Sequence, residues 1–202
     1  MYELVQHHIS GQLKVAPEHI SPKVLSYMGK PGMEVFERFR SEYEKANAKF
    51  EKKQFLVPYF MSSHPGCTLR DAIMLAEYMH KTHLHPEQVQ DFYPTPGTMS
   101  TCMFYTEIDP RNGKRVYVAK KPEEKAMQRA LMQYNRPENH DLVMKALTIA
   151  GRYDLIGRSE HCLIRDNNET RKPNSFRKNE KQRDARGGKR DVLPDKVPKH
   201  RK

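Results

Sequence analysis

Two ionisable residues, Glu18 and His19, stand directly after a short apolar-alternating run, Leu13–Ala16. A helix start follows at Ser21-Pro22, because serine is a preferred N-cap and proline suits the first helical position, and Gly29 provides a stop. The stretch predicts a strand–loop–helix unit with a carboxylate and an imidazole at the carboxyl end of the strand, where α/β proteins bind ligands. A solvated loop that caps an ordinary βα unit is the alternative, and this unit alone favours it.

Histidine and cysteine are the other residue types that could hold a metal ion. His80 and His83 lie three apart at an expected helix end, where histidine also suits the helix dipole. No carboxylate or cysteine completes a tetrahedral set near them. The three cysteines are far apart and form no CxxC or CxxxCxxC motif: Cys67, Cys102 and Cys162. We therefore expect no metal site within this chain, and a reducing compartment.

The elements that must position the loops alternate between helical stripes and apolar runs. Apolar residues at i, i+3, i+4 spacing predict a helix over 33–50. The nearly continuous apolar run 55–63 fits a parallel strand covered on both faces, and Pro58 suggests an edge position or a bulge. Residues 88–93 predict a further strand that ends in a Pro/Gly turn. This alternation predicts a parallel sheet with right-handed crossovers.

Helix signals follow the second strand and recur near the end of the chain. Thr68 as N-cap, with Asp71 three residues on, predicts a capped helix over 69–80. The tight-turn sequence 109–113 predicts a short hairpin between residues 103–108 and 114–118. Proline followed by acidic residues begins two more expected helices, 122–134 and 137–150.

Charge divides the chain unevenly. Residues 165–202 hold 14 Lys and Arg and 6 Asp and Glu, a net charge of +8. The 36 basic residues less these 14 leave 22, and the 25 acidic residues less 6 leave 19, so residues 1–164 carry only +3. The polar tail is expected to be disordered. No run approaches the length of a membrane span and no signal peptide is visible, so we expect no membrane contact and a cytoplasmic location.

Three consecutive segments together resemble one known family. They read LKVAPEHISPKVLSYMGKP, FLVPYFMSSHPGCTLRDAIMLAEYM and PEQVQDFYPTPGTMSTCMFYT. In order and spacing they resemble the second half of a radical S-adenosylmethionine domain of the YgiQ type, over roughly Val5–Ile164. The resemblance implies an α/β fold: the C-terminal half of a partial (β/α) barrel over 1–100, a hairpin-plus-helices extension over 101–164, and the disordered basic tail 165–202.

The resemblance also implies a cofactor site across the carboxyl ends of the strands. S-adenosylmethionine would lie there, with Glu18 accepting hydrogen bonds from its ribose or amino group. The other residues that the resemblance places at the cofactor are His19, Ser62, Ser63, His64, Gly66, Pro94 and Thr95. Gly66 would allow close approach because it has no Cβ. We expect Glu18, His64 and Thr95 to border one cleft.

The sequence departs from the family in one decisive respect. The CxxxCxxC loop that holds a 4Fe-4S cluster is absent, and Met1 falls just before the expected fourth strand. We therefore expect a fragment of a radical S-adenosylmethionine enzyme of unassigned reaction. It would be inactive alone and would depend on a separate chain that carries the first half of the barrel. The alternatives are a nucleic-acid (RNA)-associated protein acting through the basic tail, and an inactive gene remnant.

Overall fold

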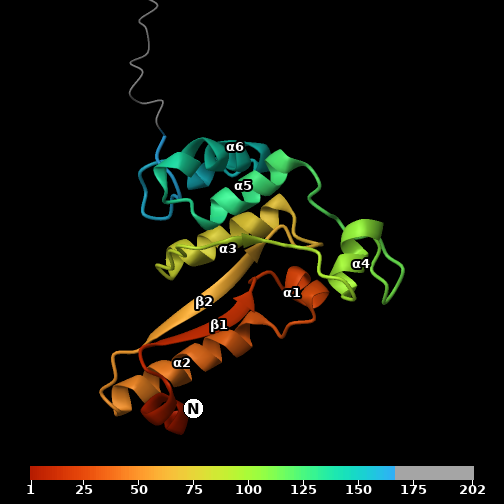
Figure 1. Cartoon of the computed structure of the whole chain (residues 1–202). Helices are drawn as coiled ribbons and strands as arrows, with labels where there is room; N and C mark the ends of the chain where they lie inside the picture. Colours follow the sequence, from red (N-terminus) through yellow and green to blue (C-terminus); the bar gives the residue numbers. More distant parts are fainter. Residues whose placement is uncertain (167–202) are drawn as a thin grey trace, which may run out of the picture. The chain divides into compact units, whose positions relative to one another are not determined.

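The computed structural model describes residues 1–166, and its strands form one small parallel sheet (Figure 1). The strands are β1 (Gln12–Glu18), β2 (Phe55–Ser62) and β3 (Gln90–Asp91), in the order β1-β2-β3. The prediction of a parallel sheet is therefore confirmed. The predicted disorder of the basic tail, and all but the first two residues of that tail, lie outside the described residues.

Helices connect the strands and stack beyond them. Between β1 and β2 lie α1 (Pro22–Met28) and α2 (Met33–Lys49), and a short π-helix, η1 (Leu4–His8), precedes β1. Figure 1 shows the helices that follow β2 lying one against another, α3 against α5 and α5 against α6. The remaining elements are α3 (Leu69–Lys81), α4 (Met99–Thr106), α5 (Pro122–Met132), η2 (Pro137–Asn139), α6 (His140–Ala150) and η3 (Tyr153–Leu155).

The helix limits follow from local signals in the sequence. A capping box fixes the start of α3. The Thr68 side chain accepts the backbone N–H of Asp71, and the Asp71 side chain accepts the backbone N–H of Thr68. Gly29 ends α1 in the left-handed conformation with φ +67°, as expected. Ser21 occupies the N-cap position of α1, but its side chain does not cap the helix. Its hydroxyl donates instead to Asp71 at 2.7 Å.

One expectation for the second strand is wrong, and those for Pro58 are confirmed. β2 lies between β1 and β3, but β3 pairs only with Met61 and Ser62, so the edge of β2 opposite β1 is unpaired at Pro58. The register with β1 shifts directly after the Val15–Pro58 pair, which confirms the irregularity that proline predicts. The expectation that both faces of β2 are covered is wrong for the first half of the strand, where Phe55 is 65% exposed and Val57 is 36% exposed. The strand expected over 88–93 is present, but only Gln90–Asp91 pairs with β2.

The first arm of the predicted hairpin is mostly helical. Residues 99–106 form α4, whose N-cap Thr98 accepts a hydrogen bond from the backbone N–H of Thr101. Only the turn survives, with one antiparallel bridge between Ile108 and Arg115. The apolar run Met103–Ile108 carried no signal that separates a strand from a buried helix, because it is too short to show a period.

One apolar core lies among α3, α5, α6 and β2. Its fully buried members include Ile73, Met79, Leu131 and Leu147. A smaller cluster around Tyr43 of α2 packs against the starts of β1 and β2. Within the described part of the chain, no helix is both long and apolar enough to cross a membrane.

Candidate functional site

Two neighbouring strands end in the same unusual way. β1 ends at Glu18 and β2 is followed by Ser63, and both have left-handed backbone, with φ +65° and +60°. This conformation costs a non-glycine residue roughly 1–2 kcal/mol and is concentrated at functional sites. Each is followed by a buried histidine, His19 and His64. The two parallel strands thus present matching turns at their carboxyl ends.

His19 is a buried, neutral imidazole. Its Nδ1 accepts the backbone N–H of Ser21 at 3.0 Å, so the proton of the neutral ring lies on Nε2, 3.5 Å from the sulfur of Cys67. Burial lowers the pKa of His19 to about 4, although the nearby Asp71 carboxylate opposes that shift. The side chain therefore links the end of β1 to the start of α3, and its ring nitrogens are already used by the protein.

His64 links the end of β2 to the first turn of α4. Its Nδ1 lies 2.8 Å from the carbonyl oxygen of Pro65 and donates to it, which leaves Nε2 to accept the hydroxyl of Ser100 at 2.9 Å. Burial lowers its pKa, and the Pro65 carbonyl acts in the opposite direction. Its ring also meets the edge of Phe92, with centroids 5.0 Å apart.

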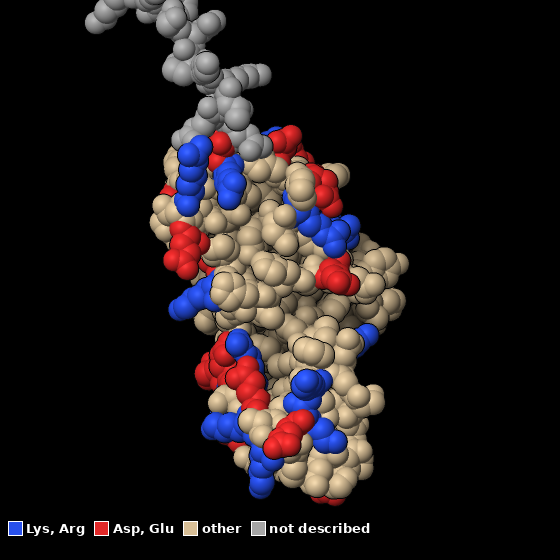
Figure 2. Space-filling view, turned by 90° about the vertical axis from the view of Figure 1, so that its left-hand side faces the viewer, with Lys and Arg blue, Asp and Glu red and all other residues tan. Residues whose placement is uncertain are grey.

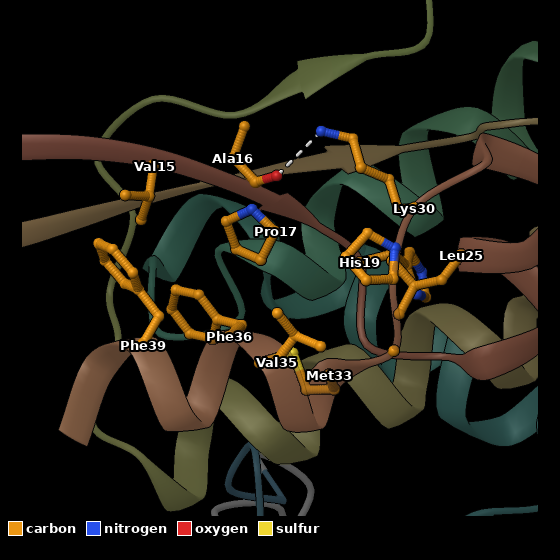
Figure 3. Close-up of a pocket in the computed structure, with 12 residues that line it drawn as sticks. Val15, Ala16, Pro17, His19, Leu25, Lys30, Met33, Val35, Phe36 and Phe39 are labelled. Carbon is orange, nitrogen blue, oxygen red and sulfur yellow. Dashed lines mark hydrogen bonds between the residues drawn. The ribbon is translucent and has the colours of Figure 1, made fainter. Parts of the chain in front are cut away.

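Glu18 is the partly exposed carboxylate of the site. Its Oε1 lies 3.0 Å from the ammonium of Lys30, and 21% of its side chain remains exposed. Lys30 also donates to the carbonyl of Ala16 at 3.2 Å (Figure 3). Glu18 can therefore still accept a hydrogen bond from a ligand, in competition with one lysine.

The two serines after β2 differ in their partners. Ser62 donates its hydroxyl to Asp91 at the end of β3. Ser63 donates its backbone N–H to Gln128 at 3.1 Å, whereas its own buried hydroxyl has no partner within residues 1–166. An unsatisfied buried hydroxyl is rare and costs about 1–3 kcal/mol, so it calls for an explanation.

Gly66 is explained by packing within the protein. A Cβ at this position would lie 2.2 Å from the ring of Tyr27, and the backbone φ is +89°. Its N–H donates to the carbonyl of Tyr117 at 2.7 Å. The expectation that the missing Cβ makes room for a ligand is thus corrected, because Tyr27 of α1 fills that space.

Pro94 and Thr95 lie apart from this network. Thr95 is exposed, and its carbonyl accepts the hydroxyls of Thr98 and Thr101 at 3.0 and 2.6 Å. The connection from this loop to His64 runs through Ser100 of α4. The structure links His19 to the segment Ser62–Cys67 through Cys67. The Glu18 carboxylate lies near enough to His64 to act on its pKa, in the direction opposite to burial. Thr95 reaches the segment only indirectly.

Two residues of the network were not expected from the sequence. Asp71 was expected only as part of a cap, but it also accepts from Ser21 and from Lys23. Gln128 is fully buried on α5, whose other buried residues are all apolar. Gln128 lies three residues before Leu131, on the apolar stripe of an amphipathic helix. A polar residue at that position was the signal that could have identified it.

An apolar hollow lies between β1 and α2. Figure 3 shows its lining, an apolar pocket of about 230 Å³ with Val15, Phe36 and Phe39 around it and Lys30 beside it. No group of three or more His, Cys, Asp or Glu side chains in the described residues could hold a metal ion. His80, the metal candidate at the end of α3, contacts Tyr134 and the carbonyl of Glu160 instead.

The chain is similar to known proteins over most of its length. Residues 87–200, more than half of the chain, match the family described as a domain of unknown function, DUF3362. This chain belongs to the DUF3362 family. The matched residues include Ser100 of α4, Gln128 of α5 and Tyr117, which lies between these two helices.

Relatives of this DUF3362 chain are longer proteins. A UPF0313 protein of Clostridium perfringens is 54% identical over 204 residues, covering 99% of this chain and 31% of the relative. UPF0313 proteins of Methanosarcina acetivorans and Clostridium botulinum are 57% and 59% identical, over 81% and 80% of this chain and 22% and 25% of the relatives. The chain thus spans about a third or less of the length of these relatives. No solved structure matches it.

Proposed function

We propose that this chain supplies one part of an S-adenosylmethionine site in a radical S-adenosylmethionine protein of unassigned reaction. The observation that carries the proposal is the pair of left-handed strand ends, Glu18 and Ser63, with an unpartnered buried hydroxyl at the second. Strained backbone at the carboxyl ends of adjacent parallel strands is where α/β proteins bind ligands. The sequence resemblance supplies the identity of the ligand.

The residues present fit the adenosyl ligand but not the cluster. The Glu18 carboxylate can accept from an ammonium or a ribose hydroxyl, and such charge-assisted bonds are the strong ones. His19 and His64 stay neutral at pH 7 because burial lowers the pKa of each, so they position the loops without adding charge. Residues 1–166 hold no group of three or more His, Cys, Asp or Glu side chains that could bind a cluster. A bound 4Fe-4S cluster would supply the electron for cleavage of the sulfonium, and its ligands belong elsewhere in our proposal.

A second polypeptide segment completes the sheet in this proposal. Gln12 and Lys14 of β1 pair with Phe55 and Val57 of β2, and the side chains of all four are exposed on one face. That face is hollowed by a pocket of about 500 Å³. β1 is an end strand, whose free edge can pair with a further strand. We call the segment that would carry the first strands of a barrel the completing segment. In this proposal it packs on this face of the sheet and pairs with the free edge of β1.

Equilibrium dialysis with S-adenosylmethionine tests the ligand. The chain is measured with and without the part of the longer Clostridium perfringens relative that this chain does not cover. We expect Glu18→Gln to weaken binding at least 10-fold, because a hydrogen bond to a charged group contributes about 1.5–3 kcal/mol. Glu44→Gln is the matched control, since Glu44 also lies 3.0 Å from a cation, Arg40, but on α2. Equal affinities for the two variants would contradict the site.

The basic tail favours a second candidate, binding to RNA. Residues 165–202 carry a net charge of +8, whereas Figure 2 shows Lys and Arg interspersed with Asp and Glu on one face of the described chain. Phosphate contacts make such binding strongly salt-dependent. Filter binding with and without residues 165–202 tests it: we expect deletion to abolish binding at low salt. Binding that survives the deletion would remove the tail from consideration.

A further inference from the structure

The segment that follows β2 is held in place by hydrogen bonds from residues of other parts of the chain. We call residues Ser62–Cys67 the β2 loop. Every residue of the β2 loop except Pro65 has a hydrogen bond to a residue within the DUF3362 match. Four outside residues make these five bonds: Asp91 to Ser62, Gln128 to Ser63 and Cys67, Ser100 to His64 and the Tyr117 carbonyl to Gly66.

Gln128 is the central partner in this set. Its Oε1 accepts the backbone N–H of Ser63 at 3.1 Å, and its Nε2 donates to the carbonyl of Cys67 at 3.1 Å. The side chain is fully buried, so water does not compete for either bond. One amide therefore spans the loop from its first turn to its last residue.

Arg129, the residue after Gln128 on α5, forms an ion pair at the end of β3. Arg129 lies 3.0 Å from the carboxylate of Asp91, which in turn accepts the hydroxyl of Ser62. Consecutive side chains of α5 thus reach the ends of both β2 and β3.

The β2 loop needs this support because its conformation is costly. Ser63 and Gly66 both have positive φ, and the left-handed turn at Ser63 directs its N–H to a side chain of α5, outside the sheet. A buried N–H without a partner would destabilise the turn, so the Gln128 oxygen is what permits it. Inside the loop, His64 donates to the Pro65 carbonyl and the Cys67 N–H donates to the His64 carbonyl. The backbone of Ser63 also acts on the Cys67 thiol, against the rise that burial causes in its pKa.

We propose that the DUF3362 region is the positioning element of the β2 loop, with Gln128 as its main positioning residue. This rests on the proposed function, since the β2 loop is one wall of the proposed adenosyl site. Gln128 touches no ligand in this proposal. It sets the left-handed backbone at Ser63, and so fixes where the loop presents its groups.

Amide hydrogen exchange of the 202-residue chain tests the positioning without any ligand. In Gln128→Leu, we expect the amides of the β2 loop to exchange at least 10-fold faster, with exchange in α6 changed no more than global stability requires. Leu131→Ala is the control, because it removes a fully buried side chain one turn further along α5 and loosens the core as a whole. Faster exchange confined to the β2 loop in Gln128→Leu alone supports the proposal.

A conservative variant and a ligand measurement complete the test. Gln128→Glu keeps the acceptor for the Ser63 amide and loses the donor to the Cys67 carbonyl, so protection should persist at Ser63 and fall at the end of the loop. This variant carries the test if Gln128→Leu does not fold. Unchanged loop exchange in both variants, or equal loosening in Leu131→Ala, overturns the positioning role. Absence of S-adenosylmethionine binding by wild type overturns the proposed ligand and leaves the exchange result to stand alone.

Discussion

At the scale of single residues, the end of β1 is fixed by buried polar groups that satisfy one another. Asp71 accepts from Ser21 at 2.7 Å and from Lys23 at 2.6 Å, as well as from Thr68. Burial opposes the charge, but these hydrogen bonds hold the pKa of Asp71 below its usual value. The carboxylate is therefore ionised at neutral pH and joins α1 to α3. His19 lies beside it as a neutral ring, so the pair has only one charge.

The neutral state of His19 predicts a pH dependence of stability. The folded-state pKa of about 4 lies below the unfolded value of 6.5, so the unfolded chain binds more protons between these values. The stability that His19 contributes is fully present above pH 6.5 and falls by up to roughly 3 kcal/mol as the pH decreases toward 4. Urea unfolding at pH 7.5 and pH 5 measures this loss. In His19→Gln we expect a much flatter dependence.

A second buried histidine contributes to the same pH range. Burial also lowers the pKa of His64, so His64→Gln should remove a separate part of the dependence. The variant with both substitutions should lose more of the dependence than either alone. An unchanged pH profile in His19→Gln would contradict a neutral buried ring at position 19.

At the scale of elements, glycines with left-handed backbone end two of the helices, α1 and α6. Gly151 ends α6 with φ +69°, and a Cβ there would meet no atom within 4 Å. Gly151→Ala should therefore cost about 1 kcal/mol through backbone strain alone. Gly11 is the control, because an added Cβ also meets nothing there and φ is not positive. Gly11→Ala should be neutral or stabilise by up to about 1 kcal/mol. Thermal unfolding of both variants measures the difference, and equal effects would contradict the strain argument.

The sequence predicted those elements whose signals are local. The capped start of α3 at Thr68 and the stop of α1 at Gly29 needed only neighbouring residues. α4 was missed because its sequence, MSTCMFYT, mixes apolar and hydroxyl residues without a helical period. Phe55 was expected to be covered, and no local pattern could show that one face of its strand is open.

The candidate site was predictable in its position but not in its partners. The loops at Glu18 and Ser62–Gly66 follow strands, and parallel strands end at one edge of a sheet, so their neighbourhood followed from the pattern. The roles of Gln128 and Tyr27 did not, because they depend on contacts between residues 61 and 39 positions apart along the chain. Long-range packing of this kind carries no signal in a single sequence.

At the scale of the whole molecule, the two faces of the sheet are unequal. On one face, Leu13 and Leu56 pack against the cluster around Tyr43 of α2. On the other, Phe55 and Val57 are exposed on β2, whose edge opposite β1 is unpaired there because β3 pairs only with Met61 and Ser62. Exposed apolar side chains next to an unpaired strand favour association, either with the completing segment or with another copy.

Replacing Phe55 and Val57 tests whether this exposed face of the sheet binds the completing segment or another copy of the chain. We expect the wild-type chain to self-associate at high concentration when the completing segment is absent, and Phe55→Lys with Val57→Lys to shift it toward monomer in sedimentation velocity. Folding should be little affected, since exposed substitutions usually change stability by within 0.5 kcal/mol. Tyr153→Lys is the matched control, because Tyr153 is 64% exposed and lies on η3, away from the sheet. With the completing segment added, the double variant should also bind that segment more weakly, because both partners use the same face. A wild-type chain that stays monomeric and ignores the segment would show that this face is simply solvated.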